Sequence, residues 1–322
     1  MRVPGLPEPV TADGLPDRVT ICEVGPRDGL QNESVVLPAE VKVEFVRRLV
    51  AAGLRLVEVT SFVRPEWVPQ LADAEAVVTA LARHPGPDGP GEWPAGLRLP
   101  VLVPNVRGLE RALALGVRDV AVFASATQAF ARRNLNRGWD EQFGMFAAVA
   151  GRARSAGAGV RGYLSMCFGD PWEGTVDAGR VVESGVRLIE LGCDQLSLGD
   201  TIGVATPGQV RRVLERFVRA GIGVDRLAVH FHDTYGQALA NTLAALGCGV
   251  TCVDASAGGL GGCPYARSAT GNLATEDLVW MLDGLGVDTG VDLDALAAAS
   301  RWMAGMLGRP SPSRVLTALT GG

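Results

Sequence analysis

Two histidines lie two residues apart in the segment His230-Phe-His232, and the chain contains only one other histidine. On a β-strand, residues i and i+2 project from the same face, so both imidazoles would point in one direction. Such a pair is typical either of a metal site or of hydrogen-bonded core side chains. Asp28 could complete a ligand set. Two imidazoles and a carboxylate, without a thiolate, favour Mg²⁺ or Mn²⁺ over a closed tetrahedral zinc site.

Three further residues are candidates for chemistry, and two of them also have a structural interpretation. Asn272 could add an amide oxygen to the ligand set, although an asparagine before a predicted helix is more often its N-cap. Arg27 could stabilise an enolate or a carboxylate, or it could form an ion pair with its neighbour Asp28. Cys263 lies in a glycine-rich loop, where no packing role explains it, and we expect it to be a reactive thiol.

The chain has a single lysine, Lys42, which falls within a predicted helix rather than at a strand end. Schiff-base catalysis requires a lysine inside the site, so a lysine-dependent aldolase is almost excluded. Carbon–carbon chemistry would then depend on an enolate stabilised by a metal. Cys248 and Cys252 have a loose zinc-like spacing, but no second ligand pair follows them.

The elements that must position these residues alternate along the chain. Short β-branched and apolar runs predict strands at residues 19–24, 54–60, 99–104, 119–124, 160–166, 195–198, 227–231 and 251–255. Helical periodicity appears at residues 39–52, 71–82, 108–115, 142–156, 178–191, 209–220 and 235–246, and an eighth helix is expected near Leu273. The alternation predicts a parallel α/β sheet with right-handed crossovers. Eight such units fit a (β/α)₈ TIM barrel, whose active site lies at the C-terminal ends of the strands.

The competing fold is an open doubly wound sheet, which usually carries a Gly-x-Gly-x-x-Gly turn after its first strand. Here the first strand leads into Gly25-Pro-Arg-Asp-Gly29 instead, so the barrel is favoured. We expect an N-terminal extension at residues 1–18, the catalytic barrel at 19–290 and a short C-terminal helical extension at 291–322. The Pro/Gly-rich residues 84–94 predict a surface loop.

Composition excludes several classes of protein. The 30 Lys and Arg residues are outnumbered by 35 Asp and Glu residues, and a net charge of −5 with dispersed charges argues against a nucleic-acid partner. No apolar run is long enough for a membrane span, and the N-terminus has no signal-peptide pattern. The six cysteines form no Cys-x-x-Cys pair, which predicts reduced thiols in a cytoplasmic protein.

Seven segments follow one another in an order that is familiar from one enzyme family. They are Val24-Gly-Pro-Arg-Asp-Gly-Leu-Gln-Asn-Glu33, Glu58-Val-Thr-Ser-Phe-Val63, Arg161-Gly-Tyr-Leu-Ser165, Ser197-Leu-Gly-Asp-Thr-Ile-Gly203, His230-Phe-His-Asp-Thr-Tyr-Gly-Gln-Ala-Leu-Ala-Asn241, Gly258-Gly-Leu-Gly-Gly-Cys-Pro-Tyr-Ala266 and Gly271-Asn-Leu-Ala-Thr-Glu-Asp277. Together they resemble the hydroxymethylglutaryl-CoA (HMG-CoA) lyases, a family of metal-dependent TIM barrels. The Arg-Asp-Gly and His-x-His elements occur across the whole lyase and synthase superfamily. The segment around Cys263 is characteristic of the lyases.

The resemblance implies a role for each matched position. The implied ligands of a divalent metal, Mg²⁺ or Mn²⁺, are Asp28, His230, His232 and Asn272. The implied catalytic residues are Cys263 as the thiol, Arg27 as the group that stabilises the enolate, and Glu58 and Asp200 as further members. The implied substrate-binding residues are Arg27, Gln31, Tyr163 and Glu276.

The function implied by the resemblance is cleavage of 3-hydroxy-3-methylglutaryl-CoA, or a close 3-alkyl analogue, to acetyl-CoA and acetoacetate. This is a reaction of leucine degradation and ketone-body formation, and it needs no redox cofactor. The implied assembly is a homodimer that acts on an acyl-CoA, without a nucleic-acid or membrane partner.

Two alternatives remain at this point. The first is a related condensing enzyme or aldolase of the same superfamily, but such enzymes typically lack the loop of Cys263, and the synthases carry a large C-terminal domain. Only about 30 residues follow the predicted barrel here. The second is a non-catalytic barrel with a structural metal site, which would not need Arg27, Glu58 or Cys263.

Overall fold

The computed structural model describes residues 3, 5–83, 92–262 and 271–320. Its nine strands run parallel in one sheet. They are β1 (Thr20–Glu23), β2 (Leu56–Val57), β3 (Thr60–Ser61), β4 (Val101–Leu102), β5 (Asp119–Ser125), β6 (Gly159–Ser165), β7 (Gln195–Asp200), β8 (Leu227–Phe231) and β9 (Cys252–Ala255). The sheet has the order β2-β1-β9-β8-β7-β6-β5-β4-β3.

The two ends of this order meet, because β2 and β3 are parts of one short stretch of chain. β2 pairs with β1, and β3 pairs with β4. Between them, the amide of Glu58 donates to Glu23 O at 2.9 Å, and the amide of Val59 donates to Pro100 O at 3.0 Å. The sheet therefore closes on itself, and the predicted TIM barrel is confirmed.

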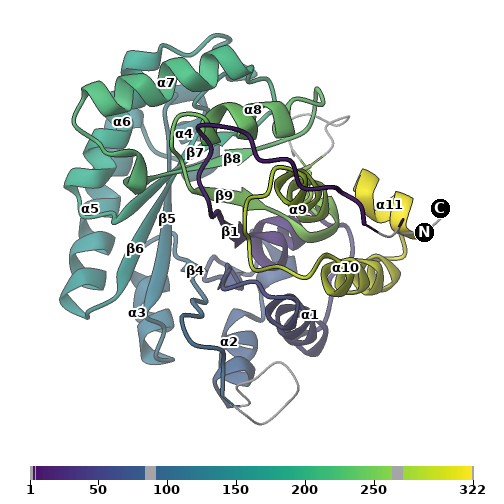
Figure 1. Ribbon diagram of the computed structural model, residues 1–322. Coiled ribbons are helices and arrows are strands. Elements are labelled where there is room, and N and C mark those ends of the chain that lie inside the picture. The colour runs from purple at the N-terminus through teal and green to yellow at the C-terminus, as the bar shows by residue number, and fades with distance from the viewer. Residues whose placement is uncertain (1–2, 4, 84–91, 263–270, 321–322) are drawn as a thin grey trace.

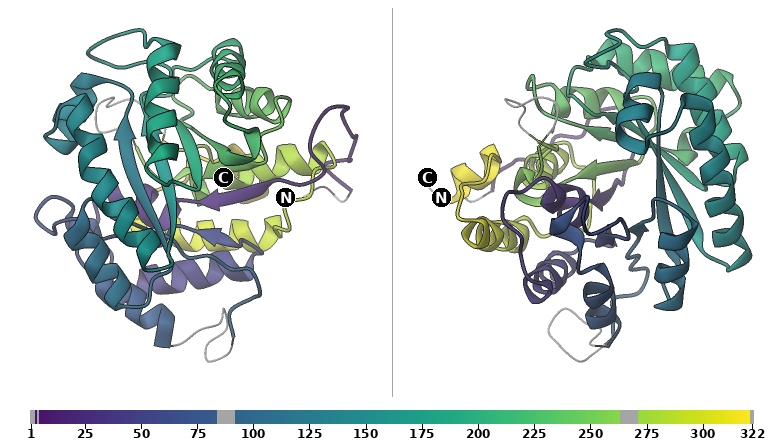
Figure 2. Two further views of the ribbon diagram at one scale, coloured as in Figure 1. Left: turned by 90° about the vertical axis from the view of Figure 1, so that its left-hand side faces the viewer. Right: turned by 180° about the vertical axis from the view of Figure 1, so that it is seen from behind.

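Helices surround the sheet on its outer side (Figures 1 and 2). They are α1 (Ala39–Ala51), α2 (Ala74–Arg83), α3 (Val106–Ala114), α4 (Gln128–Leu135), α5 (Trp139–Ser155), α6 (Ala178–Glu190), α7 (Pro207–Arg219), α8 (Ala238–Leu246), α9 (Thr275–Gly284), α10 (Leu293–Leu307) and α11 (Arg314–Thr320). Short helical turns lie at η1 (Gly25–Gly29), η2 (Pro69–Leu71), η3 (Val224–Arg226) and η4 (Ala257–Gly259). None of the described helices is both long and apolar enough to cross a membrane.

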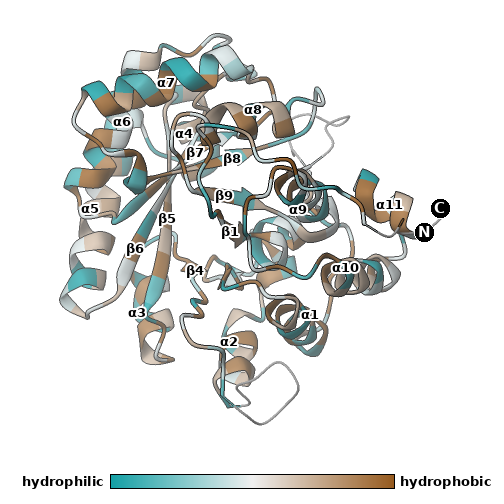
Figure 3. Ribbon diagram, in the orientation of Figure 1, coloured by the Kyte–Doolittle hydropathy of each residue, from teal (hydrophilic) through white to brown (hydrophobic). Residues whose placement is uncertain are grey.

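Amphipathic spacing explains how the outer helices pack. In α7 the residues Val210, Val213, Leu214 and Phe217 are buried, and this spacing places them on one face of the helix. Figure 3 shows hydrophilic and hydrophobic residues alternating along the same helix. Pro207 begins α7, where its missing amide hydrogen costs nothing. The buried faces of such helices and the apolar strands together form the core between the two layers.

Several predicted boundaries differ from the observed ones. α4 was not predicted, and α3 and α5 begin two and three residues before the predicted starts at residues 108 and 142. The predicted C-terminal extension contains two helices, because Gly308 adopts a left-handed conformation (φ +66°) that ends α10. Most of the predicted loop at residues 84–94 lies outside the described residues.

Lys42 lies in α1, outside the sheet, as expected for a lysine that takes no part in Schiff-base chemistry. Its side chain is buried, and Nζ donates to Asp73 Oδ1 at 2.6 Å and to the carbonyl of Gln70. The lysine therefore ties α1 to the turn that precedes α2.

Candidate functional site

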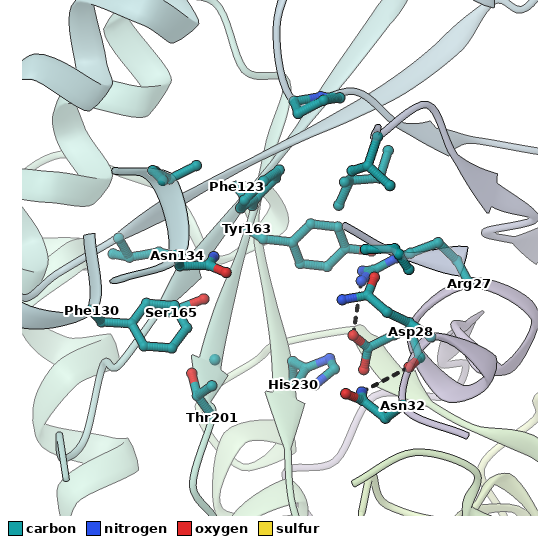
Figure 4. Close-up of a pocket in the computed structure, with 18 of the residues that line it drawn as sticks. Arg27, Asp28, Asn32, Phe123, Phe130, Asn134, Tyr163, Ser165, Thr201 and His230 are labelled. Atoms are coloured by element: carbon teal, nitrogen blue, oxygen red, sulfur yellow. Dashed lines mark hydrogen bonds and ion pairs between the residues drawn. The ribbon is translucent and has the colours of Figure 1, made fainter. Parts of the chain in front are cut away.

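A cavity of about 430 Å³ lies at the C-terminal ends of the strands. Residues that line it come from the ends of most strands, and six of them are predicted site residues, namely Arg27, Asp28, Gln31, Tyr163, His230 and His232. Figure 4 shows Arg27, Asp28 and His230 on one side of the cavity, and Phe130, Asn134, Ser165 and Thr201 on the other. This is the end of a TIM barrel where active sites occur.

Three predicted metal ligands meet at this cavity. One ligand atom each from Asp28, His230 and His232 lies within 4.8 Å of the others. Asn272 joins them, because its Nδ2 donates to Asp28 Oδ2 at 2.9 Å and to Leu260 O at 3.1 Å. The N-cap of α9 is Ala274, so the alternative interpretation of Asn272 as the cap of that helix is wrong.

The buried polar atoms of this cluster fit a metal ion. Oδ1 of Asn272 and Nδ1 of His232 are buried, and neither has a hydrogen-bond partner in the described part of the chain. Leaving such atoms without a partner is costly, so a ligand that accepts their lone pairs is expected. One carboxylate, two imidazoles and an amide oxygen together form a donor set suited to a divalent cation. The structure therefore contains a candidate metal site.

Electrostatics favour the metal-binding forms of Asp28 and His232. For His230, burial lowers the pKa, but the hydrogen bond to Asp254 and the charges of Asp254 and Asp28 together raise it by more. Burial by itself raises the pKa of Asp28, but the charges of Arg27, His230 and His232 outweigh burial and lower that pKa to about 2. Burial lowers the pKa of His232 to about 4, and the neighbouring charge of His230 acts in the same direction. At neutral pH the carboxylate is ionised and His232 is neutral, as metal ligation requires.

Arg27 is held in η1, the π-helical turn that follows β1. The carbonyl of Val24 accepts the amides of Arg27, Asp28 and Gly29 within 3.2 Å, which turns the chain sharply toward the cavity. Nε of Arg27 donates to Glu58 Oε2 at 2.6 Å, and Nη1 donates to Asp28 Oδ1 at 2.8 Å. The predicted residue Glu58 thus contacts Arg27 and is fully buried. The guanidinium is fixed between two carboxylates.

Tyr163 forms a wall of the cavity beside Arg27. Its ring centroid lies 5.4 Å from the guanidinium carbon of Arg27 and 5.2 Å from that of Arg161. Burial raises the pKa of its phenol well above the usual value, so the hydroxyl stays protonated. Its oxygen is buried without a hydrogen-bond partner among the described residues. A phenol of this kind can donate to an oxygen of a bound ligand.

Two predicted site residues, Asp200 and Glu276, bind backbone amides instead of lining the cavity. The carboxylate of Asp200 accepts the amides of Val204 and Ala205 at 3.0 and 2.9 Å, and that of Glu276 accepts the amide of Gly258 at 2.9 Å. Neither residue lines the cavity. Cys263 lies outside the described residues, although the preceding residue, Gly262, lines the cavity.

Sequence reasoning overlooked Asp254, which lies behind His230. Its side chain is buried in β9, and it pairs with Arg161 of β6, which was noticed only as part of a matching segment. A carboxylate within the apolar run Cys-Val-Asp-Ala was an available signal, because an unpaired charge in a buried strand is costly. Asn134 was also overlooked as a lining residue.

Comparison with known proteins identifies the family. The HMGL-like family model matches residues 18–303. The mitochondrial hydroxymethylglutaryl-CoA lyase of Arabidopsis thaliana is 50% identical over 95% of this chain, which spans 63% of that protein's length. The mitochondrial hydroxymethylglutaryl-CoA lyase of Rattus norvegicus is 48% identical, with 94% of this chain and 90% of the rat protein covered.

Solved structures lead to the same family. The hydroxymethylglutaryl-CoA lyase of Pseudomonas aeruginosa superposes with a TM-score of 0.90 at 44% identity, and the match covers 96% of this chain and 99% of the other. An HMG-CoA lyase of Acinetobacter baumannii, solved with coenzyme A and 3-methylmalate, gives a TM-score of 0.86 at 34% identity, covering 97% of each chain. The chain therefore belongs to the HMGL-like family and, within it, to the hydroxymethylglutaryl-CoA lyases.

Proposed function

We propose that this chain cleaves 3-hydroxy-3-methylglutaryl-CoA to acetyl-CoA and acetoacetate. The observation that carries the proposal is the placement of Arg27 at the cavity wall, directly beside the candidate metal ligands Asp28, His230, His232 and Asn272. A cation site next to a fixed guanidinium suits a reaction in which negative charge develops on an enolate oxygen. The similarity to named HMG-CoA lyases supports the same activity.

The reaction breaks the C2–C3 bond of the substrate. A general base of the site accepts the proton of the tertiary hydroxyl, C3 becomes the ketone carbon of acetoacetate, and the bond's electron pair moves to C2 as the acetyl-CoA enolate. Arg27 stabilises the enolate oxygen, because Glu58 holds its guanidinium in place before the reaction begins. Tyr163 donates its free hydroxyl to a substrate oxygen, and Gln31 contributes a further polar group.

Cys263 completes the reaction by donating a proton to the enolate carbon. Support comes from its place after Gly262, which lines the cavity, and from the characteristic lyase segment that contains it. A thiol has a pKa close enough to neutrality to act as a proton donor.

The metal of this proposal is Mg²⁺ or Mn²⁺, held by Asp28, His230, His232 and Asn272. When bound, a divalent cation supplies Lewis-acid stabilisation of substrate oxygens. Asp200 and Glu276 act from behind the cavity wall, where they hold backbone amides. We also propose a cytoplasmic homodimer. The five described cysteines have no disulfide partner among the described residues, which is usual for proteins of a reducing compartment.

A panel of acyl-CoA thioesters, assayed with added Mg²⁺, tests the activity. Release of both acetyl-CoA and acetoacetate from 3-hydroxy-3-methylglutaryl-CoA is expected. Cleavage rates of larger 3-alkyl analogues show how large a 3-substituent the cavity accepts. Condensation of acetyl-CoA with a ketoacid, without any cleavage, would instead support the synthase alternative. The absence of both reactions in a folded, metal-loaded protein would contradict the proposal.

A further inference from the structure

Asp254 binds side chains from three neighbouring strands. Nη2 of Arg161 in β6 donates to Oδ1 at 2.6 Å, and Oγ of Ser197 in β7 donates to Oδ2 at 2.7 Å. Nδ1 of His230 in β8 lies 3.3 Å from the same Oδ2. The side chain of Asp254 is fully buried, so water does not compete for its oxygens. The carboxylate thus has a fixed place directly behind one imidazole of the candidate metal site.

Arg161 keeps this arrangement electrically balanced. Only 7% of its side chain is exposed, and its pairing with Asp254 offsets the cost of burying each charge alone. The pair is neutral as a unit. Asp254 can therefore offer His230 a strong hydrogen-bond acceptor without adding net negative charge next to the metal ligands.

The two imidazoles of the site are supported differently. Nδ1 of His230 faces Asp254, which leaves Nε2 as the nitrogen available to a metal. Nδ1 of His232 is buried, and the described residues provide no hydrogen-bond partner for it. A carboxylate behind a metal-binding histidine fixes the tautomer and the ring orientation.

We propose that Asp254, held by Arg161 and Ser197, is a positioning residue that fixes the tautomer of His230 and thereby sets the metal affinity of the site. The proposal rests on the metal site of the proposed function, but its test needs no substrate. Removing such a partner typically weakens metal binding about 10–100-fold. The bond acts through His230, so Asp254 itself does not touch the metal.

The first measurement is Mn²⁺ binding to the full chain, followed by electron paramagnetic resonance of the free ion. Asp254→Asn removes the charge while nearly keeping the shape, and we expect a rise of about 10–100-fold in Kd for Mn²⁺. Because this variant leaves Arg161 buried without its partner, the double variant Arg161→Met, Asp254→Asn is measured beside it. We expect the double variant to regain thermal stability and still bind Mn²⁺ weakly.

The control is Asp170→Asn, because Asp170 is also a buried carboxylate with several hydrogen bonds, yet it contacts none of the candidate metal ligands. Its Kd for Mn²⁺ should stay within about twofold of the wild type. Wild-type Mn²⁺ affinity in the folded double variant would show that the Arg161–Asp254 pair is only structural, and would overturn the proposal.

The second measurement reads the tautomer directly. The chain has three histidines, so ¹⁵N-histidine labelling of the metal-free protein gives a small set of ring signals. We expect one ring to show a fixed Nδ1–H tautomer that becomes a mixture in the double variant. An unchanged set of ring signals would overturn the proposal. A wild-type chain that binds Mn²⁺ tightly but fails to cleave HMG-CoA would contradict the proposed function and leave this inference intact.

Discussion

Arg27 shows how one side chain is fixed by several neighbours at once. It contacts Glu58, Asp28 and the face of Tyr163, and only 8% of its side chain is exposed. Burial lowers the pKa of its guanidinium, but the charges of Glu58 and Asp28 raise it by more, so the cation is secure at any working pH. A lysine cannot form the same planar set of contacts.

We expect Arg27→Lys to lower kcat by at least about 10²-fold, because a point charge on a flexible chain cannot replace a preorganised donor. Mn²⁺ affinity should change only a few-fold, since the ligands themselves remain. Steady-state release of acetyl-CoA and Mn²⁺ titration provide the two measurements. Arg98→Lys, which alters a half-exposed pair with Asp119, is the matched control. A normal kcat in Arg27→Lys would remove this residue from the mechanism.

The proposed role of Cys263 predicts a kinetic loss without a loss of folding. Serine has a far higher pKa than a thiol, so Cys263→Ser should lower kcat by about 10²-fold while Tm and metal binding stay near the wild type. Cys248→Ser, at a half-buried cysteine outside the cavity, should retain full activity. Normal turnover in Cys263→Ser would mean that another group donates the proton.

At the scale of elements, the loop after β6 fixes the start of α4. Asp170 accepts the hydroxyl of Thr127 at 2.6 Å, and Glu173 Oε1 accepts the amide of Ala129 in the first turn of α4 at 2.6 Å. α4 contributes Phe130 and Asn134 to the cavity wall. The loop after β6 therefore positions α4, a helix that lies in the connection after β5.

Because the loop after β6 holds α4, a substitution at Asp170, which does not line the cavity, should change substrate binding. Asp170→Asn should raise KM about tenfold with a smaller effect on kcat, because a charged acceptor of several hydrogen bonds is lost and α4 shifts. Asp177→Asn provides the matched control, since asparagine is as good an N-cap of α6 as aspartate. Equal KM values in the two variants would show that the loop does not position α4.

Two buried carboxylates hold η4, the turn between β9 and the segment that leads to Gly262 at the cavity wall. Glu23 accepts the amide of Ala257 at 2.8 Å, and Glu276 accepts the amide of Gly258. Burial raises the pKa of Glu276 to about 7, and burial also raises that of Glu23 to about 7. The folded chain therefore holds these protons more tightly than the unfolded chain does.

A raised pKa in the folded state means that stability falls as pH rises from about 4.5 to about 7 and that the loss is complete above it. Glu276→Gln removes this titration, so the wild type should lose stability relative to the variant between pH 5 and pH 8. The expected relative shift is about 3 kcal/mol at most. Urea unfolding at several pH values measures it, with the exposed Glu40→Gln as control. A pH-independent difference between wild type and Glu276→Gln would contradict the assignment.

At the scale of the whole molecule, the barrel was predictable because its strands are apolar and end in polar residues. Asp28, His230 and His232 lie at such ends, so their convergence followed from the topology alone. α4 was missed because Gln-Ala-Phe-Ala-Arg-Arg-Asn-Leu is short and depends on contacts from the loop after β6. Tertiary contacts of this kind have no local signature.

Positions inside the barrel were harder to predict than positions at its rim. Asp254 is held by Arg161, which is 93 residues away in sequence, and no spacing rule connects them. Glu276 belongs to a matching segment, yet its side chain turns away from the cavity toward η4. Family resemblance indicates which residues matter, whereas the direction of each side chain comes only from the packed structure.

Residues far apart in the sequence form the metal site, so metal binding should stabilise the whole fold. Asp28 follows β1, the histidines lie on or just after β8, and Asn272 precedes α9. A ligand that binds only the folded state adds about 2.7 kcal/mol at one hundred times its Kd. Chelation should therefore lower Tm and abolish activity, and Mg²⁺ or Mn²⁺ should restore both.

Metal-dependent stabilisation also distinguishes the two candidate ligand histidines from His84, the third histidine of the chain. In His232→Ala, a ligand is lost, and we expect the rise in Tm on adding Mn²⁺ to shrink to less than half of the wild-type value. His84→Ala, outside the described residues and within the predicted loop at residues 84–94, should keep the full rise. Differential scanning fluorimetry across a Mn²⁺ titration provides the measurement. An equal rise in Tm in both variants would show that His232 is not a ligand. In the chelation experiment, full activity of the metal-free protein would exclude metal-dependent chemistry.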